Sequence, residues 1–498
     1  METFRKIYWL LILMMIGFQI QLVNAQYAED VLRLSQFGSS VGARSQGMGN
    51  TVVGVADDFS ALFGNPAGLS QQRDYEFSAG LSRLGYGNDV TFFGNKTTDN
   101  DNAMSLNNLG IVYPIATVRG GLTFAFGFGR VANYTSIASF NGYNSSSSII
   151  PTIVPSTNTY SYSDADYKSF YDNSIPYQLW LADIFTDTVN GIEKLVPQIL
   201  KNVQQTGTIR EGGGMNNWSF GGGIDIAPNI SLGVTLNFTS GSYTYDRTYQ
   251  ESDPNNLNLL VVNNVNTYLN QFIWQSTITD DITGFNALLG LMYRKPGLYR
   301  IGFTVKLPTT YEISETFTDD YSSTFKSDYN TAYQMSTNGI TSYKVTTPTV
   351  LSGGISVQPF EWLLFAGDAE YTDWTQMEFD TDNPDLIQEN QNIKNWMRET
   401  WNLRGGAEAT IFNWGLILRA GVESKPSPWK NDPSSYDQLT YTAGIGILID
   451  ASSTINASFA YGNWNTFRDN YTWGITPASR TSESITTQTI NLTFSHRF

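Results

Sequence analysis

Residues able to perform catalysis are scarce in this chain. It has no cysteine and a single histidine, His496, close to its carboxyl end. A serine hydrolase needs a histidine within reach of its serine, and a thiol enzyme or thiolate metal site needs cysteine. The adjacent carboxylates of Asp57 and Asp58 could suggest a metal ion, but two neighbouring aspartates without further ligands are more often helix caps. We therefore predict no enzyme activity, no metal and no cofactor.

The segment that contains these aspartates, residues 41–69, is the most distinctive part of the chain. It is dense in small residues, among them Gly47 and Gly49, which permit close backbone packing in a confined volume. Residues 57–63 are expected to form a short helix, with an aspartate at its start and a glycine–asparagine–proline sequence after it. A compact segment of this kind fits a plug inside a wider structure.

The amino-terminal residues have the features of an export signal. Two basic residues precede an apolar run over residues 7–18, and a small-residue cleavage site ends at Ala25. The apolar run is shorter than the roughly 20 residues of a membrane-spanning helix. We therefore predict that residues 1–25 are a cleaved signal peptide, which leaves residues 26–73 as the plug and residues 74–498 as the main domain.

Composition favours a membrane barrel for the main domain. Aromatic residues make up 14% of the chain and charged residues only 15%. Soluble domains typically have roughly 25% charged residues. In a transmembrane barrel alternate residues face lipid, while the others face a polar lumen or packed interior. The net charge of −16 argues against nucleic acid as a partner, because binding to phosphates requires a basic surface.

From residue 74 onward the chain divides into strand-like runs rich in glycine, aromatic and β-branched residues. Short connections alternate with long polar ones, and one strand on each side of every connection gives about fourteen strands, an even number as a closed bacterial barrel requires. A soluble β-sandwich would not readily explain this alternation. The long connections are predicted near residues 85–104, 133–216, 247–280, 316–342, 380–396, 424–438 and 464–482.

Two of the long connections contain apolar residues at helical spacing. In the loop at residues 133–216 the spacing runs over residues 185–203, and in the loop at residues 247–280 it runs, less regularly, over residues 257–272. Both loops are therefore predicted to be partly helical. The apolar stripe of the first could pack as a cap over the barrel mouth or form a groove that collects apolar ligands.

The last strand-like run ends the chain. Ile490, Leu492 and Phe494 alternate with polar residues, and the register continues to Phe498. A period of two indicates one lipid-facing side. A strand with a terminal aromatic residue resembles the sorting signal by which the barrel-assembly machinery recognises outer-membrane proteins. The resemblance implies that Phe498 is this signal and that the machinery is a partner during biogenesis.

Together these segments resemble the FadL-type outer-membrane transporters of long-chain fatty acids and other hydrophobic compounds. That family has a fourteen-stranded barrel filled by an amino-terminal hatch with an Asn-Pro-Ala signature, matched here by Asn65, Pro66 and Ala67. The match continues in residues 348–374 and 401–428 and so spans most of the mature chain.

The resemblance implies transport of a hydrophobic small molecule, which is captured at extracellular loops and released past a gate formed by the hatch. Gly47 and Gly49 belong to this implied gate together with the Asn-Pro-Ala signature. In the family an inward kink of the third strand opens the barrel wall to the membrane, which implies Gly127 and Gly129 as the kink. Glycines are also common on crowded barrel walls, and this simpler reading stays open. Residues 133–216 depart from the family pattern and leave the identity of the ligand open.

Two alternatives to transport stay open at this stage. A PorV-like barrel, which shuttles secreted proteins to a surface secretion system, shares the Gly-Ala-Arg and Asn-Pro-Ala-Gly-Leu patterns. A general porin would need a water-filled constriction, and the plug-like segment at residues 47–69 argues against an open pore. The expectation is an all-β protein of the outer membrane, in contact with its lipid, that transports a hydrophobic ligand.

Overall fold

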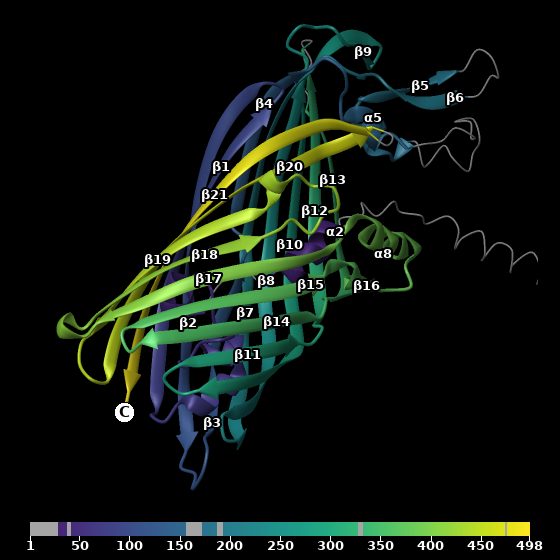
Figure 1. Cartoon of the computed structure of the whole chain (residues 1–498). Helices are drawn as coiled ribbons and strands as arrows, with labels where there is room; N and C mark the ends of the chain where they lie inside the picture. Colours follow the sequence, from purple (N-terminus) through teal and green to yellow (C-terminus); the bar gives the residue numbers. More distant parts are fainter. Residues whose placement is uncertain (1–27, 37–40, 156–171, 187–192, 327–331, 474–475) are drawn as a thin grey trace, which may run out of the picture.

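A computed structural model describes residues 28–36, 41–155, 172–186, 193–326, 332–473 and 476–498 of the protein. They form one β-barrel with the amino-terminal segment inside it (Figure 1). None of the helices in these ranges is long and apolar enough to cross a membrane. The predicted signal peptide, residues 1–25, lies outside the described residues.

Fourteen antiparallel strands make the wall, which confirms the count predicted from the sequence. The first and last strands, β1 and β21, pair with each other and close the barrel. The wall strands are β1 (Glu76–Phe92), β2 (Asn95–Ile115), β3 (Leu122–Asn133), β7 (Val203–Ala227), β8 (Ile230–Ser252), β10 (Val265–Lys295), β11 (Tyr299–Lys306), β14 (Val350–Phe360), β15 (Leu363–Asp373), β17 (Glu399–Ile411), β18 (Leu416–Lys425), β19 (Gln438–Leu448), β20 (Ser453–Trp473) and β21 (Thr476–Arg497).

The other elements extend or fill this wall. β12 (Thr310–Phe325) and β13 (Tyr333–Thr346) continue β11 and β14 past Pro308 and Pro348, because a proline cannot donate to the ladder and interrupts the strand. The remaining elements are β4 (Ser136–Asn144), β5 (Ala182–Thr186), β6 (Glu193–Pro197), β9 (Leu259–Val262), β16 (Glu378–Asp380), α2 (Ala28–Ser35), α3 (Ala43–Gly47), α4 (Ala61–Gly64), η1 (Pro66–Gln71), α5 (Ile150–Ile153), α7 (Ile175–Gln178), η2 (Trp374–Gln376), α8 (Pro384–Trp396), η3 (Phe412–Trp414) and η4 (Ser434–Tyr436).

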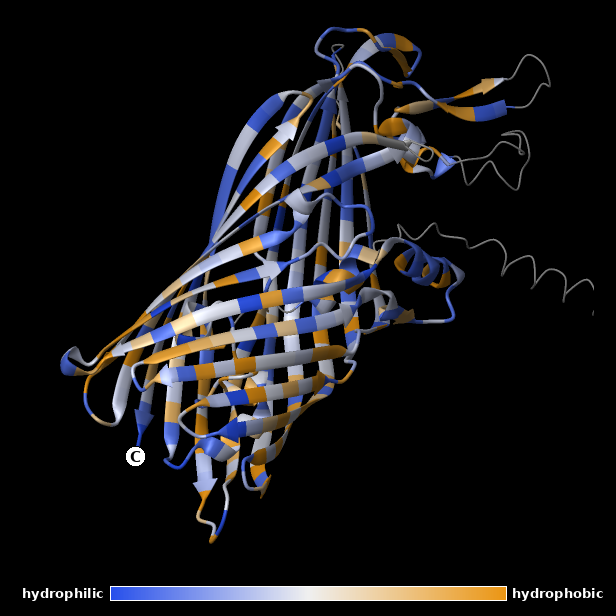
Figure 2. Ribbon diagram, viewed as in Figure 1, coloured by the Kyte–Doolittle hydropathy of each residue, from blue (hydrophilic) through white to orange (hydrophobic). Residues whose placement is uncertain are grey.

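The outer face of the barrel carries an apolar band. On β10, Phe285, Leu289 and Leu291 are exposed while Leu288 between them is buried. The same alternation on the other strands gives the apolar surface in the lower half of Figure 2, as expected for a wall that faces lipid. The band ends above Phe285, because the outward side chain of Asp281 is polar and exposed. Barrels of this class place tight turns in the periplasm, so we name the end with the tight turns periplasmic and the other end extracellular.

The wall is taller on one side than on the other. β15, β18 and β19 are short, whereas β8, β10 and β20 continue far beyond the apolar band (Figure 1). Several segments that the sequence predicts as long loops are these strand extensions, including residues 85–104, where β1 and β2 pair up to Phe92 and Asn95. Beyond the band the outer face meets water, so the apolar alternation that marks a strand disappears while backbone pairing continues.

The predicted helix in the loop at residues 247–280 is wrong. Residues 257–272 form β9 and the start of β10. Leu259 and Val261 are exposed, and the two residues that alternate with them are buried. A period of two and β-branched side chains favour a strand, and pairing with β10 outweighed the helical spacing.

The loop at residues 133–216 contains helix, but at other positions than the apolar spacing over residues 185–203 predicts. The described part of the stretch 185–203 contains the end of β5, all of β6 and the start of β7, while residues 187–192 lie outside the described residues. The helices α5 and α7 of this loop have four residues each. Leu195 and Ile199 are buried because they pack with neighbouring extracellular segments, not because they share one helix face.

Candidate functional site

The segment over residues 41–71 lies inside the barrel, and we call it the hatch. Its elements α3, α4 and η1 are short, and Leu62 and Ala67 are fully buried. The helix predicted over residues 57–63 is reduced to α4. Asp58 begins the turn before it, since the backbone N–H of Ser60 donates to Asp58 Oδ1 at 2.8 Å. The hatch therefore occupies the interior with compact turns instead of regular helices.

Asn65 connects two parts of the hatch to the barrel wall. Its side chain is fully buried, and Nδ2 donates to the carbonyl oxygens of Val53, at 2.9 Å, and of Leu291 on β10, at 3.3 Å. Its Oδ1 accepts from the backbone N–H of Ala67 at 3.1 Å, which caps η1, and Pro66 occupies the first turn of that helix. The Asn-Pro-Ala signature therefore joins η1, the preceding hatch turn and β10.

A row of wall glycines gives the hatch room to approach. A Cβ on Gly290 would overlap Asn65 Oδ1, one on Gly302 would overlap the carbonyl of Val53, and one on Gly233 would overlap Pro66. Gly233 and Gly290 face each other in register, as do Gly302 and Gly354 on the next strands. We call the set the glycine collar. Its members are Gly223, Gly233, Gly290, Gly302, Gly354, Gly406, Gly421 and Gly444.

Gly47 and Gly49 meet the collar from the hatch side. Gly49 has φ +69°, a conformation that favours glycine, and a Cβ there would lie 2.6 Å from the carbonyl oxygen of Gly405. Its backbone N–H donates to Thr442 Oγ1 at 2.9 Å, and the same hydroxyl donates to the carbonyl of Gly47 at 3.2 Å. The structure therefore brings both residues together with the barrel wall.

Arg44 forms the main ionic link between hatch and wall. Its Nε and Nη2 donate to the two carboxylate oxygens of Glu408 on β17, at 2.8 and 2.9 Å. Its Nη1 contacts Asp57 and, at 3.3 Å, Asp58. Asp57 also pairs with Arg300 on β11, at 2.8 Å. The two aspartates singled out by the sequence thus act as partners of arginines.

A cavity of about 430 Å³ lies between the hatch and α2. The hatch contributes Val52 and Phe63 to its lining, and α2 contributes Leu32 and Ser35. Trp429, from the loop after β18, lines it as well. The cavity is therefore lined by the amino-terminal part together with the wall and its loops.

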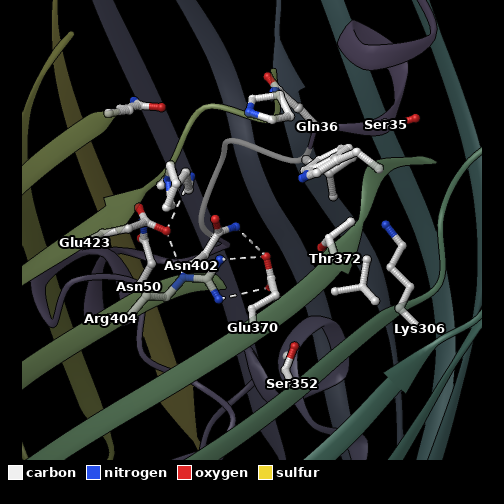
Figure 3. A pocket seen from close by; sticks show the side chains of 18 of the residues that line it. Ser35, Gln36, Asn50, Lys306, Ser352, Glu370, Thr372, Asn402, Arg404 and Glu423 are labelled. Carbon is white, nitrogen blue, oxygen red and sulfur yellow. Dashed lines mark hydrogen bonds and ion pairs between the residues drawn. The ribbon is translucent and has the colours of Figure 1, made fainter. Parts of the chain in front are cut away.

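One side of the cavity carries a ladder of charges (Figure 3). Arg404 Nε donates to Glu423 Oε1 at 2.7 Å, and its Nη1 donates to Glu370 Oε2 at 3.1 Å. Asn402 donates to Glu370 at 2.9 Å, and Asn50 of the hatch donates to Glu423 at 2.6 Å. A ligand in this cavity meets apolar side chains together with the paired charges of Glu370, Arg404 and Glu423.

The wall has a break in backbone pairing beside the hatch. β2 and β3 pair over eight residues, and the last pair toward the extracellular end is Asn108 with Gly129. β2 bulges at this point, where Asn107 accepts a hydrogen bond from the backbone N–H of Gly42 at 2.7 Å. Beyond it β2 stays with β1, and β3 stays with β7. The break lies at the height of Leu106, which faces outward within the apolar band.

Gly127 and Gly129 lie on β3 where it leaves β2. A Cβ on Gly127 would lie 2.5 Å from the ring of Phe59, and one on Gly129 would lie 2.7 Å from the ring of Phe63. Neither glycine has a left-handed backbone conformation, and the register shift of β3 against β7 falls just beyond Gly129. The close approach of two hatch rings therefore requires these glycines.

Sequence reasoning missed the residues that give the site its character. Asn107, Arg44 and the charge ladder were not singled out as site residues. A signal for the ladder existed: Glu370, Arg404 and Glu423 are ionisable residues inside apolar wall strands, where such residues are rare and often functional.

His496 does not complete a catalytic triad. Its Nδ1 lies 3.0 Å from Ser453 Oγ, but Asp450 accepts from Ser453, at 3.1 Å, and not from the imidazole. In a triad the acid holds the second nitrogen of the histidine. Asp450 also accepts from the backbone N–H groups of Ser452 and Ser453, so Asp450 stabilises the periplasmic turn that contains these two serines. In the described part of the chain, no group of three or more His, Cys, Asp or Glu residues could hold a metal ion.

Comparison with known proteins finds similarity only among solved structures. No protein-family model and no curated protein matches the chain. The P. putida toluene transporter TodX aligns with 93% of this chain and 99% of its own, at 14% identity and a TM-score of 0.53. A Pseudomonas aeruginosa FadL homologue gives 93% and 99% coverage, 12% identity and a TM-score of 0.55. The Ralstonia pickettii toluene transporter TbuX gives 94% and 100% coverage, 16% identity and a TM-score of 0.50.

These alignments cover nearly all of each barrel, and the identities are too low to carry more than the architecture. They agree with the fourteen-stranded wall and the helical segment that precedes it. The fold expected from the Asn-Pro-Ala signature is thereby confirmed: the chain has the barrel fold of the FadL-type transporters.

Proposed function

We propose that the protein transports hydrophobic small molecules across the outer membrane. The observation that carries this proposal is the cavity between α2 and the hatch, whose lining includes Val131 on β3 and Phe63. The ring of Phe63 also approaches Gly129, where β3 leaves β2. The solved structures with the same fold include transporters named for toluene. None of the steps requires a nucleophile, since capture is driven by removing apolar surface from water, about 0.8 kcal/mol per buried CH₂.

In this proposal the hatch is the gate and the wall break is the exit. A ligand enters from the extracellular end, rests in the cavity and leaves sideways between β2 and β3 when the hatch moves away from Asn107. Asn65, Pro66 and Ala67 hold the closed state together with Gly47 and Gly49. A sideways exit keeps an apolar ligand out of the periplasmic water, because the break opens at the level of the apolar band.

Uptake by whole cells tests the transport. A Gram-negative host without a transporter of this kind, expressing the protein, is expected to take up radiolabelled oleate or toluene faster than the same host with an empty vector. Uptake of a hydrophilic sugar serves as the control and is expected to stay unchanged, because the hatch blocks a water-filled path. Equal uptake with and without the protein would contradict the proposal.

Replacing Gly127 and Gly129 with valine is expected to abolish most of this uptake. The new side chains would take the space that the rings of Phe59 and Phe63 now occupy beside the wall break and would narrow the exit itself. The matched control is Gly353→Val, a wall glycine whose added side chain would meet open space. If the double variant folds and transports as the wild type does, the assignment of the exit to this part of β3 fails.

Phe498 ends the chain with its ring stacked 6.0 Å from that of Tyr75, and the two residues exchange backbone hydrogen bonds at the seam between β1 and β21. This placement suits a signal read by the barrel-assembly machinery during closure of the barrel. The secretion-shuttle alternative is not favoured, since the solved structures with this fold include two toluene transporters.

A further inference from the structure

A row of polar side chains crosses the tall part of the wall, beyond the apolar band. Tyr243 on β8 faces Asp280 on β10, and Asp280 faces Glu315 on β12, each directly in register. Tyr134 lies next to this row. Its backbone N–H donates to the carbonyl of Gly213, and Gly213 pairs with Tyr243 in the sheet. Asp280 and Glu315 are only 5% and 2% exposed. Two like charges directly opposite each other destabilise a sheet unless a positive charge compensates them.

Several atoms in this row have no partner within the described residues. These atoms are Asp280 Oδ1, Glu315 Oε1 and the hydroxyls of Tyr134 and Tyr243. All four side chains are at least nine-tenths buried. Glu315 accepts one long hydrogen bond, 3.3 Å, from the hydroxyl of Tyr343. Buried charges in proteins are normally paired, so these carboxylates and hydroxyls form an incomplete site for a positive group.

The helix α2 already places one cation beside this row. Arg33, the only basic residue of α2, lies with its guanidinium carbon 4.0 Å from the centre of the Tyr243 ring. Its guanidinium forms an ion pair with Asp30, at 2.8 Å, and among the described residues neither Asp280 nor Glu315 forms an ion pair. Burial, together with the neighbouring carboxylates, raises the pKa of both Asp280 and Glu315 to about 7. The row therefore favours an added cation over an anion or a neutral group.

The chemistry of the row favours an organic cation. Tyrosine rings attract ammonium groups through their π faces, and carboxylates supply the opposite charge. Tyr134 and Tyr243 pack edge to face, 5.7 Å apart, and Tyr343 closes the other side beside Glu315. We propose that Asp280, Glu315 and these tyrosines bind the ammonium group of a cationic ligand, which competes with Arg33 and releases α2 from the cavity.

Release of α2 would connect this site to the lumen. α2 lines the cavity through Leu32 and Ser35, so a ligand that displaces it also uncovers the cavity. Only the uncovering of the cavity rests on the proposed transport function. Binding of the cation can be tested without transport.

Three aromatic probes of similar shape and different charge test the site: benzyltrimethylammonium, benzoate and toluene. Each is titrated into the purified protein in lipid nanodiscs, and binding is measured by calorimetry. We expect benzyltrimethylammonium to bind, and Asp280→Asn with Glu315→Gln to weaken it at least about tenfold. The matched control, Asp281→Asn with Glu312→Gln, removes two exposed carboxylates of the same strands and is expected to leave it unchanged. Toluene binding is expected to survive both pairs of changes.

Arg33→Gln separates binding from a structural role of the row. Because Arg33 competes with the ligand, its removal is expected to tighten benzyltrimethylammonium binding about threefold or more. A row that only supports α2 would give no change or weaker binding, which would overturn the proposal. The proposal would also be overturned if benzyltrimethylammonium bound no better than benzoate. It would be overturned as well if replacing Asp280 and Glu315 changed only the pH dependence of stability and left the binding of benzyltrimethylammonium unchanged. Loss of toluene binding alone would instead count against the transport function.

Discussion

Replacing Arg44 with glutamine is expected to release the hatch from the barrel wall. The change leaves Glu408, Asp57 and Asp58 without their shared cation, while Arg300 and Arg419 compensate only part of the charge. Removing one partner of a buried ion pair typically costs about 3–5 kcal/mol. The barrel itself is expected to persist, because its wall is held by continuous backbone pairing.

The measurement is single-channel conductance in planar bilayers, together with growth on large antibiotics. The variant is expected to open frequent, large conductance steps and to sensitise cells, whereas the wild type stays closed. Arg44→Lys keeps the charge and should leak less, although it loses the paired contact with Glu408. Arg83→Gln, on an exposed arginine of β1, is the control for loss of a positive charge. A silent Arg44→Gln channel would show that the ionic link does not hold the hatch.

Replacing Asn65 with leucine is expected to unfasten the turn that contains the Asn-Pro-Ala signature. The variant keeps the side-chain size but loses both donors, to Val53 and Leu291, and the acceptor for the N–H of Ala67. Buried groups left without partners cost about 1–3 kcal/mol each. Branched leucine also has to fit against Gly290, where Asn65 already lies in close contact.

Hydrogen exchange with mass spectrometry checks this prediction. Amides over residues 53–71 are expected to exchange faster in the variant, with no change in the wall strands. Asn65→Asp separates the contribution of the acceptor from that of the donors. It keeps the acceptor for the N–H of Ala67 and loses the donors to Val53 and Leu291. Unchanged exchange over the hatch in the leucine variant would rule out a fastening role for Asn65.

The wall could be predicted from the sequence because lipid enforces alternation. Inside the apolar band every outward residue must be apolar, so runs such as the one ending at Phe494 show a clear period of two. Beyond the band this constraint ends. The strand extension at residues 95–104, rich in Asn, Asp and Thr, therefore has the composition of a loop, although its backbone pairs with β1.

The spacing of apolar residues misplaced both predicted helices for a related reason. Spacing of three and four residues arises by chance when short strands from different pairs follow each other, as in β5, β6 and β7. Leu259 and Val261 alternate with buried neighbours only once β9 pairs with β10. The spacing of apolar residues within one segment does not show which other segment it pairs with, or in which register.

The sequence motif of the candidate site could be predicted, but the contacts between the hatch and the wall could not. Asn65, Pro66 and Ala67 were singled out through a resemblance, yet the collar glycines that receive them come from other strands. Gly290 lies beside Asn65 because of the register in which β10 pairs with β8 and β11. Arg404 faces Glu423 for the same reason, through the pairing of β17 with β18.

Mass spectrometry of the molecules that co-purify with the detergent-extracted protein tests the transport account most directly. The wild type is compared with a variant in which Asn65, Pro66 and Ala67 are replaced together. The account predicts that a defined hydrophobic species is enriched with the wild type and lost from the variant, because the hatch forms the floor of the cavity. A wild-type barrel that carries no such species, and retains protein partners instead, would contradict it.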